Sequence, residues 1–231
     1  MESTILSKQE LRIFAQQIAI EQVGVKGQEK LKQSSVLVIG AGGLGVTVLQ
    51  NLASSGIGTL GISDNSIIQE SDLPRYNLFG ISDLGKHKAI ATKDKLKKNH
   101  PQISYNIHNI CISDKNTHLI CSNYDIIVDA TKHLPTSKVL IETCCSQGKP
   151  MVFGTINGLT GMITVFNYKD SHKFEDVFST ETFKTHSYSP LSTLAPLVGI
   201  TGSYMAGEVI KIIIGMKKIA NTHVISIPFC S

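Results

Sequence analysis

The stretch from Ser35 to Asp64, SVLVIGAGGLGVTVLQNLASSGIGTLGISD, decides the fold of this chain. It opens on an apolar run, residues 36–39, which is typical of a strand buried on both faces. A glycine-rich turn with the spacing G-x-G-x-x-G follows over residues 40–45, and residues 46–55 then have the composition of a helix. A second strand over residues 59–63 ends on Asp64, which lies nineteen residues after the last glycine of the turn. Strand, glycine turn, helix, strand and acid together predict a nucleotide-binding βαβ unit.

Each part of this motif has a physical reason. Gly40 allows the tight turn, Gly42 lets the backbone approach a phosphate, and Gly45 lets the helix pack closely on the strand. Gly43 belongs to the same turn, and the N–H groups of a helix N-terminus attract an anion. We therefore expect Gly40, Gly42, Gly43 and Gly45 among the nucleotide contacts. Asp64 can accept a hydrogen bond from a ribose hydroxyl. A purely structural glycine turn is the alternative, and the two strands and the acid favour nucleotide binding over it.

Composition predicts one globular domain over residues 1–231. We expect no apolar run of the length that a membrane span requires, and no signal peptide, and hence no membrane partner. The net charge of +4 is mild, and the lysines within residues 86–98 lack interleaved aromatic side chains. This pattern favours a solvated helix face over nucleic-acid binding. The five cysteines contain no C-x-x-C pair, which favours reduced thiols in a cytoplasmic protein.

The rest of the chain predicts further elements around the βαβ unit. Ser7 and Glu10 form a capping box for a helix that Gly24 ends. We expect further helices over 27–33, 85–99 and 135–147, strands over 103–107, 125–129, 151–153 and 224–227, an antiparallel strand over 162–168, a crossing loop over 170–190, and a core helix over 191–214 that breaks at Pro196 or Gly199. The order predicts a Rossmann-like, doubly wound α/β fold: a mostly parallel sheet with an antiparallel extension and N-terminal helices.

Several landmarks along nearly the whole chain resemble the ThiF/MoeB/HesA family, the bacterial relatives of ubiquitin-activating enzymes. Besides the glycine turn and Asp64, the landmarks are Gly27-Gln28-Glu29-Lys30-Leu31, Leu73-Pro74-Arg75, Gly85-Lys86-His87-Lys88, Asp125 to Thr131, Gly161 to Phe166, and Ala195 to Gly199. The resemblance implies a cytoplasmic homo- or heterodimer that uses ATP and magnesium. It also implies a reaction, the adenylation of the C-terminal glycine of a ubiquitin-like sulfur carrier protein or of a peptide C-terminus.

Carried over position by position, the resemblance makes Asp64 the ribose partner and makes Arg75 and Lys88 the catalytic contacts of the triphosphate. Their charges would stabilise the negative charge that develops as a carboxylate attacks the α-phosphate and pyrophosphate leaves. The alternative makes Arg75 a surface turn residue and Lys88 one lysine among many. The context of the other landmarks favours the catalytic interpretation.

The chain also departs from the family pattern at several positions. Gln16 stands where the family has an arginine that reaches into the neighbouring subunit, and Asp72 stands in place of an asparagine. Lys132 replaces the acid that usually holds magnesium, so a magnesium ion is possible but lacks its usual ligand. The two C-x-x-C pairs for structural zinc are missing, so we expect no zinc, and we assign no residue as a metal ligand. The loop cysteine of some members has no counterpart over residues 185–192.

Two functions of different class remain open from the sequence. One is an adenylating enzyme with an altered site. The other is a catalytically degenerate subunit or scaffold that binds nucleotide or an active partner. Asp64, Arg75 and Lys88 favour nucleotide binding in both cases, whereas Gln16 and Lys132 count against turnover by the chain alone. A dehydrogenase that binds NAD is disfavoured, because no His or Tyr constellation for hydride transfer is evident; fold alone would not separate these classes.

Overall fold

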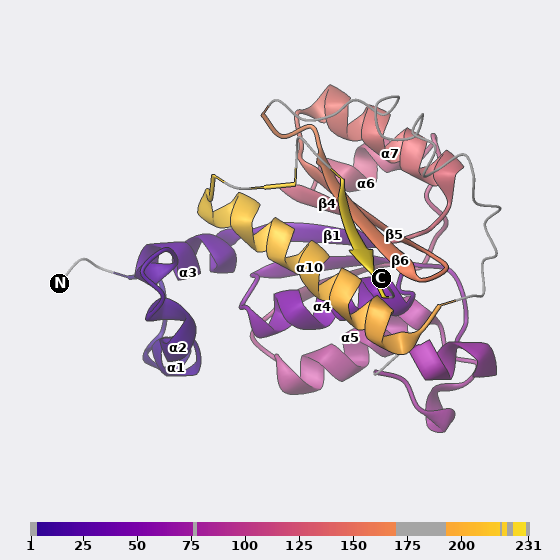
Figure 1. Ribbon diagram of the computed structural model, residues 1–231. Helices are drawn as coiled ribbons and strands as arrows, with labels where there is room; N and C mark the ends of the chain where they lie inside the picture. The colour runs from indigo at the N-terminus through magenta and orange to yellow at the C-terminus, as the bar shows by residue number, and fades with distance from the viewer. Residues whose placement is uncertain (1–3, 76–77, 170–192, 218, 221–223, 230–231) are drawn as a thin grey trace.

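A mixed sheet of seven strands organises the chain in a computed structural model that describes residues 4–75, 78–169, 193–217, 219–220 and 224–229 (Figure 1). The strand order is β3-β2-β1-β4-β5-β6-β7. Pairing is parallel from β3 through β5, and β6 and β7 add antiparallel strands at one edge. The strands are β1 (Ser35–Ile39), β2 (Thr59–Ser63), β3 (Ser104–His108), β4 (Ile126–Asp129), β5 (Met151–Asn157), β6 (Thr160–Phe166) and β7 (Ile225–Pro228). This topology confirms the predicted Rossmann-like sheet and its antiparallel extension.

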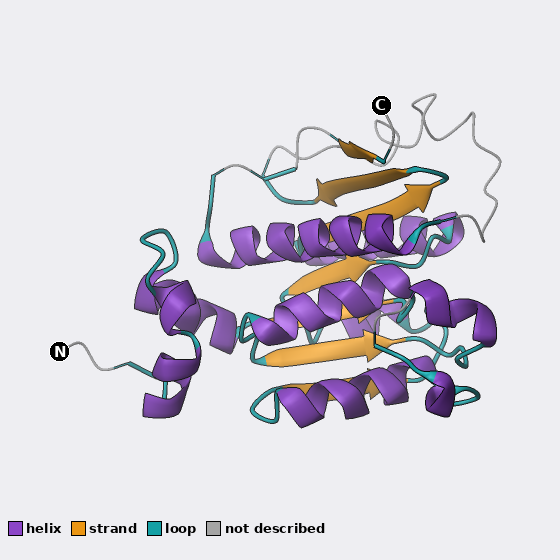
Figure 2. Cartoon of the chain, turned by 60° about the horizontal axis from the view of Figure 1, so that its bottom comes forward, coloured by secondary structure: helices purple, strands orange, loops and turns teal. Residues whose placement is uncertain are grey.

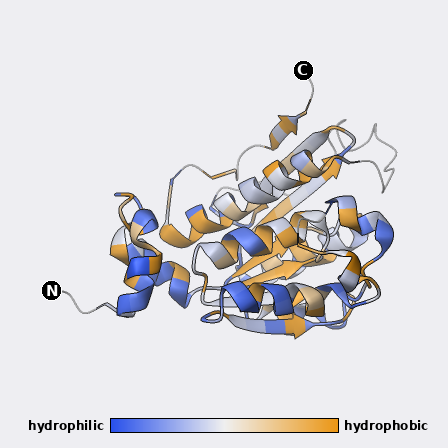
Figure 3. Cartoon of the chain, turned by 90° about the horizontal axis from the view of Figure 1, so that it is seen from below, coloured by the Kyte–Doolittle hydropathy of each residue, from blue (hydrophilic) through white to orange (hydrophobic). Residues whose placement is uncertain are grey.

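Helices cover both faces of the sheet (Figure 1), and Figure 2 shows one of these helical layers in front of the strands. One face packs against α4 (Gly43–Ser54), α5 (Lys88–Asn99) and α10 (Ala195–Ile214), with Val36 and Val38 of β1 in the shared core. The other face packs against α6 (Thr117–Cys121) and α7 (Leu134–Gln147), with Leu37 and Ile39 of β1 pointing that way. Both sets of alternate β1 side chains are buried because a parallel strand is covered on both faces. Figure 3 shows that the central strands are mostly hydrophobic, whereas the helices around them carry both hydrophilic and hydrophobic residues.

The N-terminal helices lie beside the sheet and differ in their limits from the prediction (Figure 1). Ser7 does cap α1 (Lys8–Ile13) in a capping box with Glu10, as the sequence predicts. The chain then breaks at Phe14, and α2 (Ala15–Ile18) is a separate turn. The sequence predicts that Gly24 ends a helix, but it begins α3 (Gly24–Gln33) instead. Its positive φ of 56° makes it the corner between two helices rather than a terminator.

The helix α10 is continuous over 20 residues, contrary to the break expected at Pro196 or Gly199. Pro196 lies in the first turn, where its missing N–H costs no helical hydrogen bond. By length and composition α10 is also apolar enough to cross a membrane, whereas the sequence pattern predicts no such run. Its buried residues, among them Leu197, Met205 and Val209, lie in the core against the sheet, which is the core position that the sequence predicts.

The connection from β2 to α5 is ordered by a small core of its own. It contains two 3-10 helices, η1 (Glu70–Arg75) and η2 (Ile81–Asp83). Ile68 and Phe79 pack there with Val46 of α4 and Ala91 of α5. This packing holds the long connection against α4 and α5. The short helix α6 was not predicted, and the crossing loop expected over 170–190 lies outside the described residues.

Candidate nucleotide-binding site

A cavity of about 450 Å³ opens at the carboxyl ends of the parallel strands. The chain runs from β1 outward to β2 and β3 and then returns to β4 on the other side of β1. Neighbouring strands that lead in opposite directions leave a crevice at their ends, which is where open α/β sheets bind ligands. Ile39 of β1 pairs with Ser63 of β2 and with Asp129 of β4, so the residues after these three strands meet at one edge.

The glycine turn forms one wall of this cavity. Gly40 has a φ of 92°, and a Cβ there would lie 2.9 Å from the carbonyl oxygen of Ala130, so both conformation and space require glycine. Gly42 is the N-cap of α4, and Gly40, Gly42 and Gly43 line the cavity. The first N–H groups of α4 have no partner within the helix and can bind an anion.

Two of the glycines have packing roles. A Cβ on Gly45 would overlap the carbonyl oxygen of Gly40, so this glycine lets α4 begin close against β1, as the sequence predicts. Gly45 does not line the cavity, however, and its place among the expected nucleotide contacts is therefore not supported. A Cβ on Gly43 would meet Val198 of α10 at 2.8 Å and the carbonyl oxygen of Arg75 at 3.0 Å. Gly43 thus lets both elements approach the turn.

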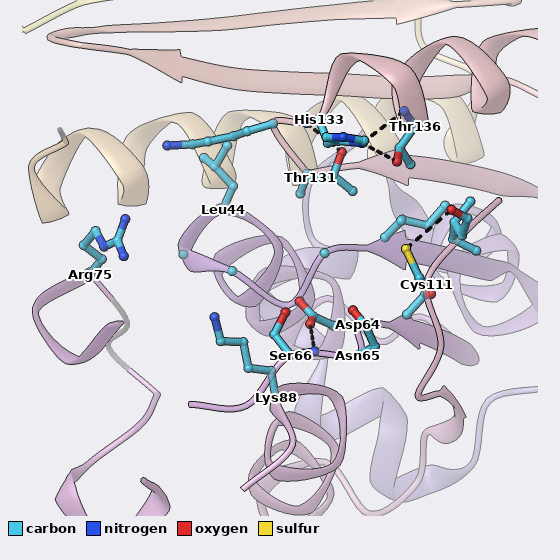
Figure 4. A pocket seen from close by; sticks show the side chains of 18 of the residues that line it. Leu44, Asp64, Asn65, Ser66, Arg75, Lys88, Cys111, Thr131, His133 and Thr136 are labelled. Atoms are coloured by element: carbon cyan, nitrogen blue, oxygen red, sulfur yellow. Dashed lines mark hydrogen bonds between the residues drawn. The ribbon is translucent and has the colours of Figure 1, made fainter. Parts of the chain in front are cut away.

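Asp64 lines the cavity from the end of β2 (Figure 4). Its Oδ2 accepts a hydrogen bond of 2.7 Å from the N–H of Ala41, and its Oδ1 accepts one of 2.7 Å from the N–H of Ser66. The carboxylate is therefore oriented by the glycine turn itself. Each carboxylate oxygen can accept a further bond, so Asp64 retains the capacity to bind a hydroxyl.

Arg75 and Lys88 line the same cavity although thirteen residues separate them (Figure 4). Both interact with Asp72: its Oδ2 lies 3.0 Å from Lys88 Nζ, and its Oδ1 lies 3.4 Å from Arg75 Nη2. Asp72 also accepts from the N–H of Gln69 and is buried. In the sequence Asp72 stands out only as a departure from the family pattern, whereas the structure shows that it holds the two cations in place.

Lys132 is the third cation that lines the cavity. It follows β4 in a left-handed conformation with φ 59°, and it is half-buried. Burial lowers the pKa of its ammonium group, and the positive charge of Arg75 lowers that pKa further. The structure therefore places Lys132 at the ligand edge, as the sequence predicts, and sets it close enough to Arg75 to be repelled.

Other residues around the cavity were not predicted. Cys111 lies on the loop after β3, and His133 follows Lys132 and caps α7 through Nδ1. Their signal in the sequence is position alone, because each lies just beyond a strand end. Gln16 is exposed on α2 and does not line the cavity within this chain.

These features define an α/β protein of Rossmann-like topology whose ligand edge carries a glycine turn, a strand-end acid and three cations. The chain matches the model of the ThiF family over residues 14–227, and it therefore belongs to the ThiF family.

The curated relatives are adenylyltransferases by name. The chain is 36% identical over 219 residues to a probable molybdopterin-synthase adenylyltransferase of Porphyra purpurea, and the match covers 94% of this chain and 57% of that protein. It is 31% identical over 226 residues to the sulfur carrier protein adenylyltransferase of Thermus thermophilus, covering 95% of this chain and 83% of that protein. The chain thus spans little more than half the length of the Porphyra relative and 62% of a similarly named protein of Gracilaria tenuistipitata.

Solved structures show the same fold. The chain superposes on PaaA with a TM-score of 0.82 at 22% identity, covering 99% of this chain and 73% of that one. It superposes on Escherichia coli MccB bound to ATP with a TM-score of 0.75 at 24% identity, covering 88% and 63% respectively. The predicted family and the predicted fold are both confirmed.

Proposed function

We propose that this chain binds ATP and adenylates the C-terminal carboxylate of a ubiquitin-like sulfur carrier protein or of a peptide. The observation that carries the proposal is the cavity in which the glycine turn, Asp64 and the cations Arg75 and Lys88 meet at one sheet edge. The names of the curated relatives support adenylyl transfer to a carrier protein, and MccB was solved with ATP.

In this reaction a carboxylate oxygen of the acceptor attacks the α-phosphorus of ATP. A bond forms between that oxygen and phosphorus, the bond from phosphorus to the bridging oxygen breaks, and pyrophosphate leaves with the electron pair. Asp64 would bind the ribose, and the N-terminus of α4 would face the phosphates. Arg75 and Lys88 would stabilise the charge that accumulates on the leaving pyrophosphate, because cations that are already held in place need no reorganisation as that charge develops.

The wider assembly is part of the same proposal. We place the protein in the cytoplasm as a homo- or heterodimer, in which the neighbouring subunit would complete the site near its N-terminal helices. Gln16 occupies the position from which the family's arginine would do so, and its side chain carries no charge. A nucleotide-binding subunit without turnover is the second candidate, favoured by Gln16 and by Lys132 at the metal position.

Exchange of labelled pyrophosphate into ATP separates the two candidates. The purified chain is assayed with carrier proteins that end in glycine, with the same carriers lacking that glycine as controls. Pyrophosphate exchange that requires one intact carrier and is lost in Arg75→Ala would establish that the chain is an adenylating enzyme. ATP binding without exchange, with any carrier or added partner subunit, identifies the non-catalytic subunit, and failure to bind ATP overturns both.

A further inference from the structure

Lys132 is a positively charged side chain in a place where a positive charge is unfavourable. It is half-buried, it lines the cavity beside Arg75, and no carboxylate among the described residues lies within ion-pair distance of it. Buried or partly buried charges in proteins are usually paired, because desolvation is costly. By contrast, Arg75 and Lys88 share the carboxylate of Asp72. Among the described residues, therefore, no anion balances the charge of Lys132.

The backbone around Lys132 is held in place by several hydrogen bonds. Asp129 Oδ1 accepts from the N–H and from the hydroxyl of Thr131, and Thr131 Oγ1 accepts from the N–H of His133. Lys132 lies inside this turn with a positive φ, which is unusual for a side chain with a Cβ. Strained residues of this kind concentrate at ligand sites when the surrounding structure imposes them. The turn therefore presents the lysine to the cavity in a fixed place.

The carboxylates near this turn do not form a magnesium site. Asp129 is fully buried, and its oxygens accept from Thr131 and from the hydroxyl of Ser137. Asp72 is engaged by two cations, and Asp64 is the only acidic residue among those described that lines the cavity. Magnesium needs oxygen ligands in octahedral geometry, usually one or two carboxylates with phosphate oxygens and water. An ammonium group at the end of β4 repels a divalent cation instead.

We propose that Lys132 is the built-in counter-ion for the phosphates of the bound nucleotide, so that this chain takes free ATP in preference to its magnesium complex. This inference rests on the proposed nucleotide binding and adds the form of the substrate. The cavity already holds three cations against one lining carboxylate. A metal complex would bring two further positive charges into that field, whereas free ATP brings the anion that Lys132 lacks.

The test is calorimetric titration of this chain with ATP, once in EDTA and once in saturating magnesium. Wild type is expected to bind ATP more tightly in EDTA than in saturating magnesium. Lys132→Met keeps the length of the side chain and removes its charge, so it should weaken binding in EDTA by about 10- to 100-fold, the range of one charge-assisted hydrogen bond. Lys138→Met on the exposed side of α7 is the matched control and should bind like wild type.

A second readout tests the same charge without ligand. Removing a half-buried cation that has no carboxylate partner in the part of the chain that the structure describes should raise the melting temperature of the ligand-free protein. Lys132→Met should therefore be more stable and yet bind ATP more weakly. A residue with only a structural role would not move these two quantities in opposite directions.

Two results would overturn the inference while leaving nucleotide binding intact: ATP binding that is as tight or tighter in magnesium than in EDTA, or Lys132→Met binding ATP in EDTA as tightly as wild type. Failure of wild type to bind ATP in both solutions would instead overturn the proposed function together with the inference.

Discussion

Asp72 Oδ2 lies 3.0 Å from Lys88 Nζ, and both side chains are almost completely withdrawn from solvent. The second oxygen of the same carboxylate faces Arg75. A single acid thus sets the positions of the two cations that would contact a triphosphate, and it also offsets part of their charge. ATP must compete with Asp72 for both.

Replacing Asp72 with asparagine should therefore separate stability from binding. The amide of the Asp72→Asn variant would keep an acceptor for the N–H of Gln69 but would carry no charge. We expect the free energy of unfolding, measured in urea, to fall by about 1–3 kcal/mol, because two poorly solvated cations lose their anion. ATP binding should become several-fold tighter in calorimetry. Weaker ATP binding by a folded Asp72→Asn protein would show that Asp72 orients the cations more than it competes for them.

Asp64 should determine both affinity and the choice of nucleotide. We expect the chain to bind ATP more tightly than NAD, and Asp64→Ala to weaken ATP by about 1–3 kcal/mol, the scale of a charge-assisted hydrogen bond. Calorimetry with the two nucleotides is the measurement. Asp64 also accepts hydrogen bonds from the N–H groups of Ala41 and Ser66. The thermal unfolding of Asp64→Ala must therefore be measured as well, so that a loss of nucleotide binding can be told from damage to the turn. Tighter binding of NAD by wild type would contradict the assignment.

Lys132→Asp should restore a metal requirement. An acid at this strand end would provide an oxygen ligand, so magnesium should then tighten ATP binding, and pyrophosphate exchange should rise if the remaining groups are competent. The double variant with Gln16→Arg should exceed either single variant if the site is shared between subunits. If wild type exchanges rapidly with magnesium and Lys132→Asp leaves the rate unchanged, Lys132 has no part in the chemistry.

Asp83 should contribute to stability in a pH-dependent way. Its carboxylate accepts from Lys95, from the N–H of Gly80 and from Lys86, and these bonds hold its pKa well below the usual range. A depressed pKa in the folded state stabilises the protein above the unfolded-state pKa, and this contribution is lost as the pH falls. Asp83→Asn should cost about 1 kcal/mol near pH 7, a modest value because both lysines keep contact with solvent.

The pH series for Asp83 uses urea unfolding of wild type and variant side by side. The difference in the free energy of unfolding between wild type and variant should reach its full value above about pH 4, the pKa of Asp in the unfolded chain. It should become smaller as the pH is lowered further. A difference that does not change with pH would show that the pairing of Asp83 with the lysines contributes little.

The absence of any C-x-x-C pair predicts that the purified protein contains no stoichiometric zinc. Among the residues that the structure describes, no group of three His, Cys, Asp or Glu side chains could hold a metal ion. Metal analysis of untagged protein should find well under one zinc per chain, and a chelator should leave the melting temperature unchanged. One tightly bound zinc per chain would refute this prediction.

The elements that carry strong local patterns were predictable from the sequence. The glycine turn with its flanking apolar runs predicts β1, α4 and β2, and the run before Asp129 predicts β4, because strands buried on both faces are uniformly apolar. The predictions at Gly24 and Pro196 were wrong in different ways. Gly24 begins α3 where the sequence predicts the end of a helix, and Pro196 lies in the first turn of α10 where the sequence predicts a break. Glycine and proline mark corners, and whether a corner begins or ends a helix depends on the packing beyond it.

The sequence predicts which residues belong to the site better than it predicts the contacts between them. Asp64, Arg75 and Lys88 do meet at one cavity, as the resemblance implies. The sharing of Asp72 by two cations comes from a long connection whose course depends on a small core around residues 68 and 79. Local sequence patterns do not describe such tertiary packing. The position of Gly45 away from the cavity has a related reason, since spacing alone does not tell a glycine that faces a ligand from one that faces a neighbouring strand.

The close approach at Gly43 connects two distant parts of the chain mechanically. Val198 in the first turns of α10 and the backbone of Arg75 both press against the space where a Cβ of Gly43 would lie. Close-packed contacts of this kind transmit displacement, because protein interiors have low compressibility. A displacement at the start of α10 would therefore have to be accommodated by the glycine turn or by the backbone of Arg75, two segments that lie far earlier in the sequence.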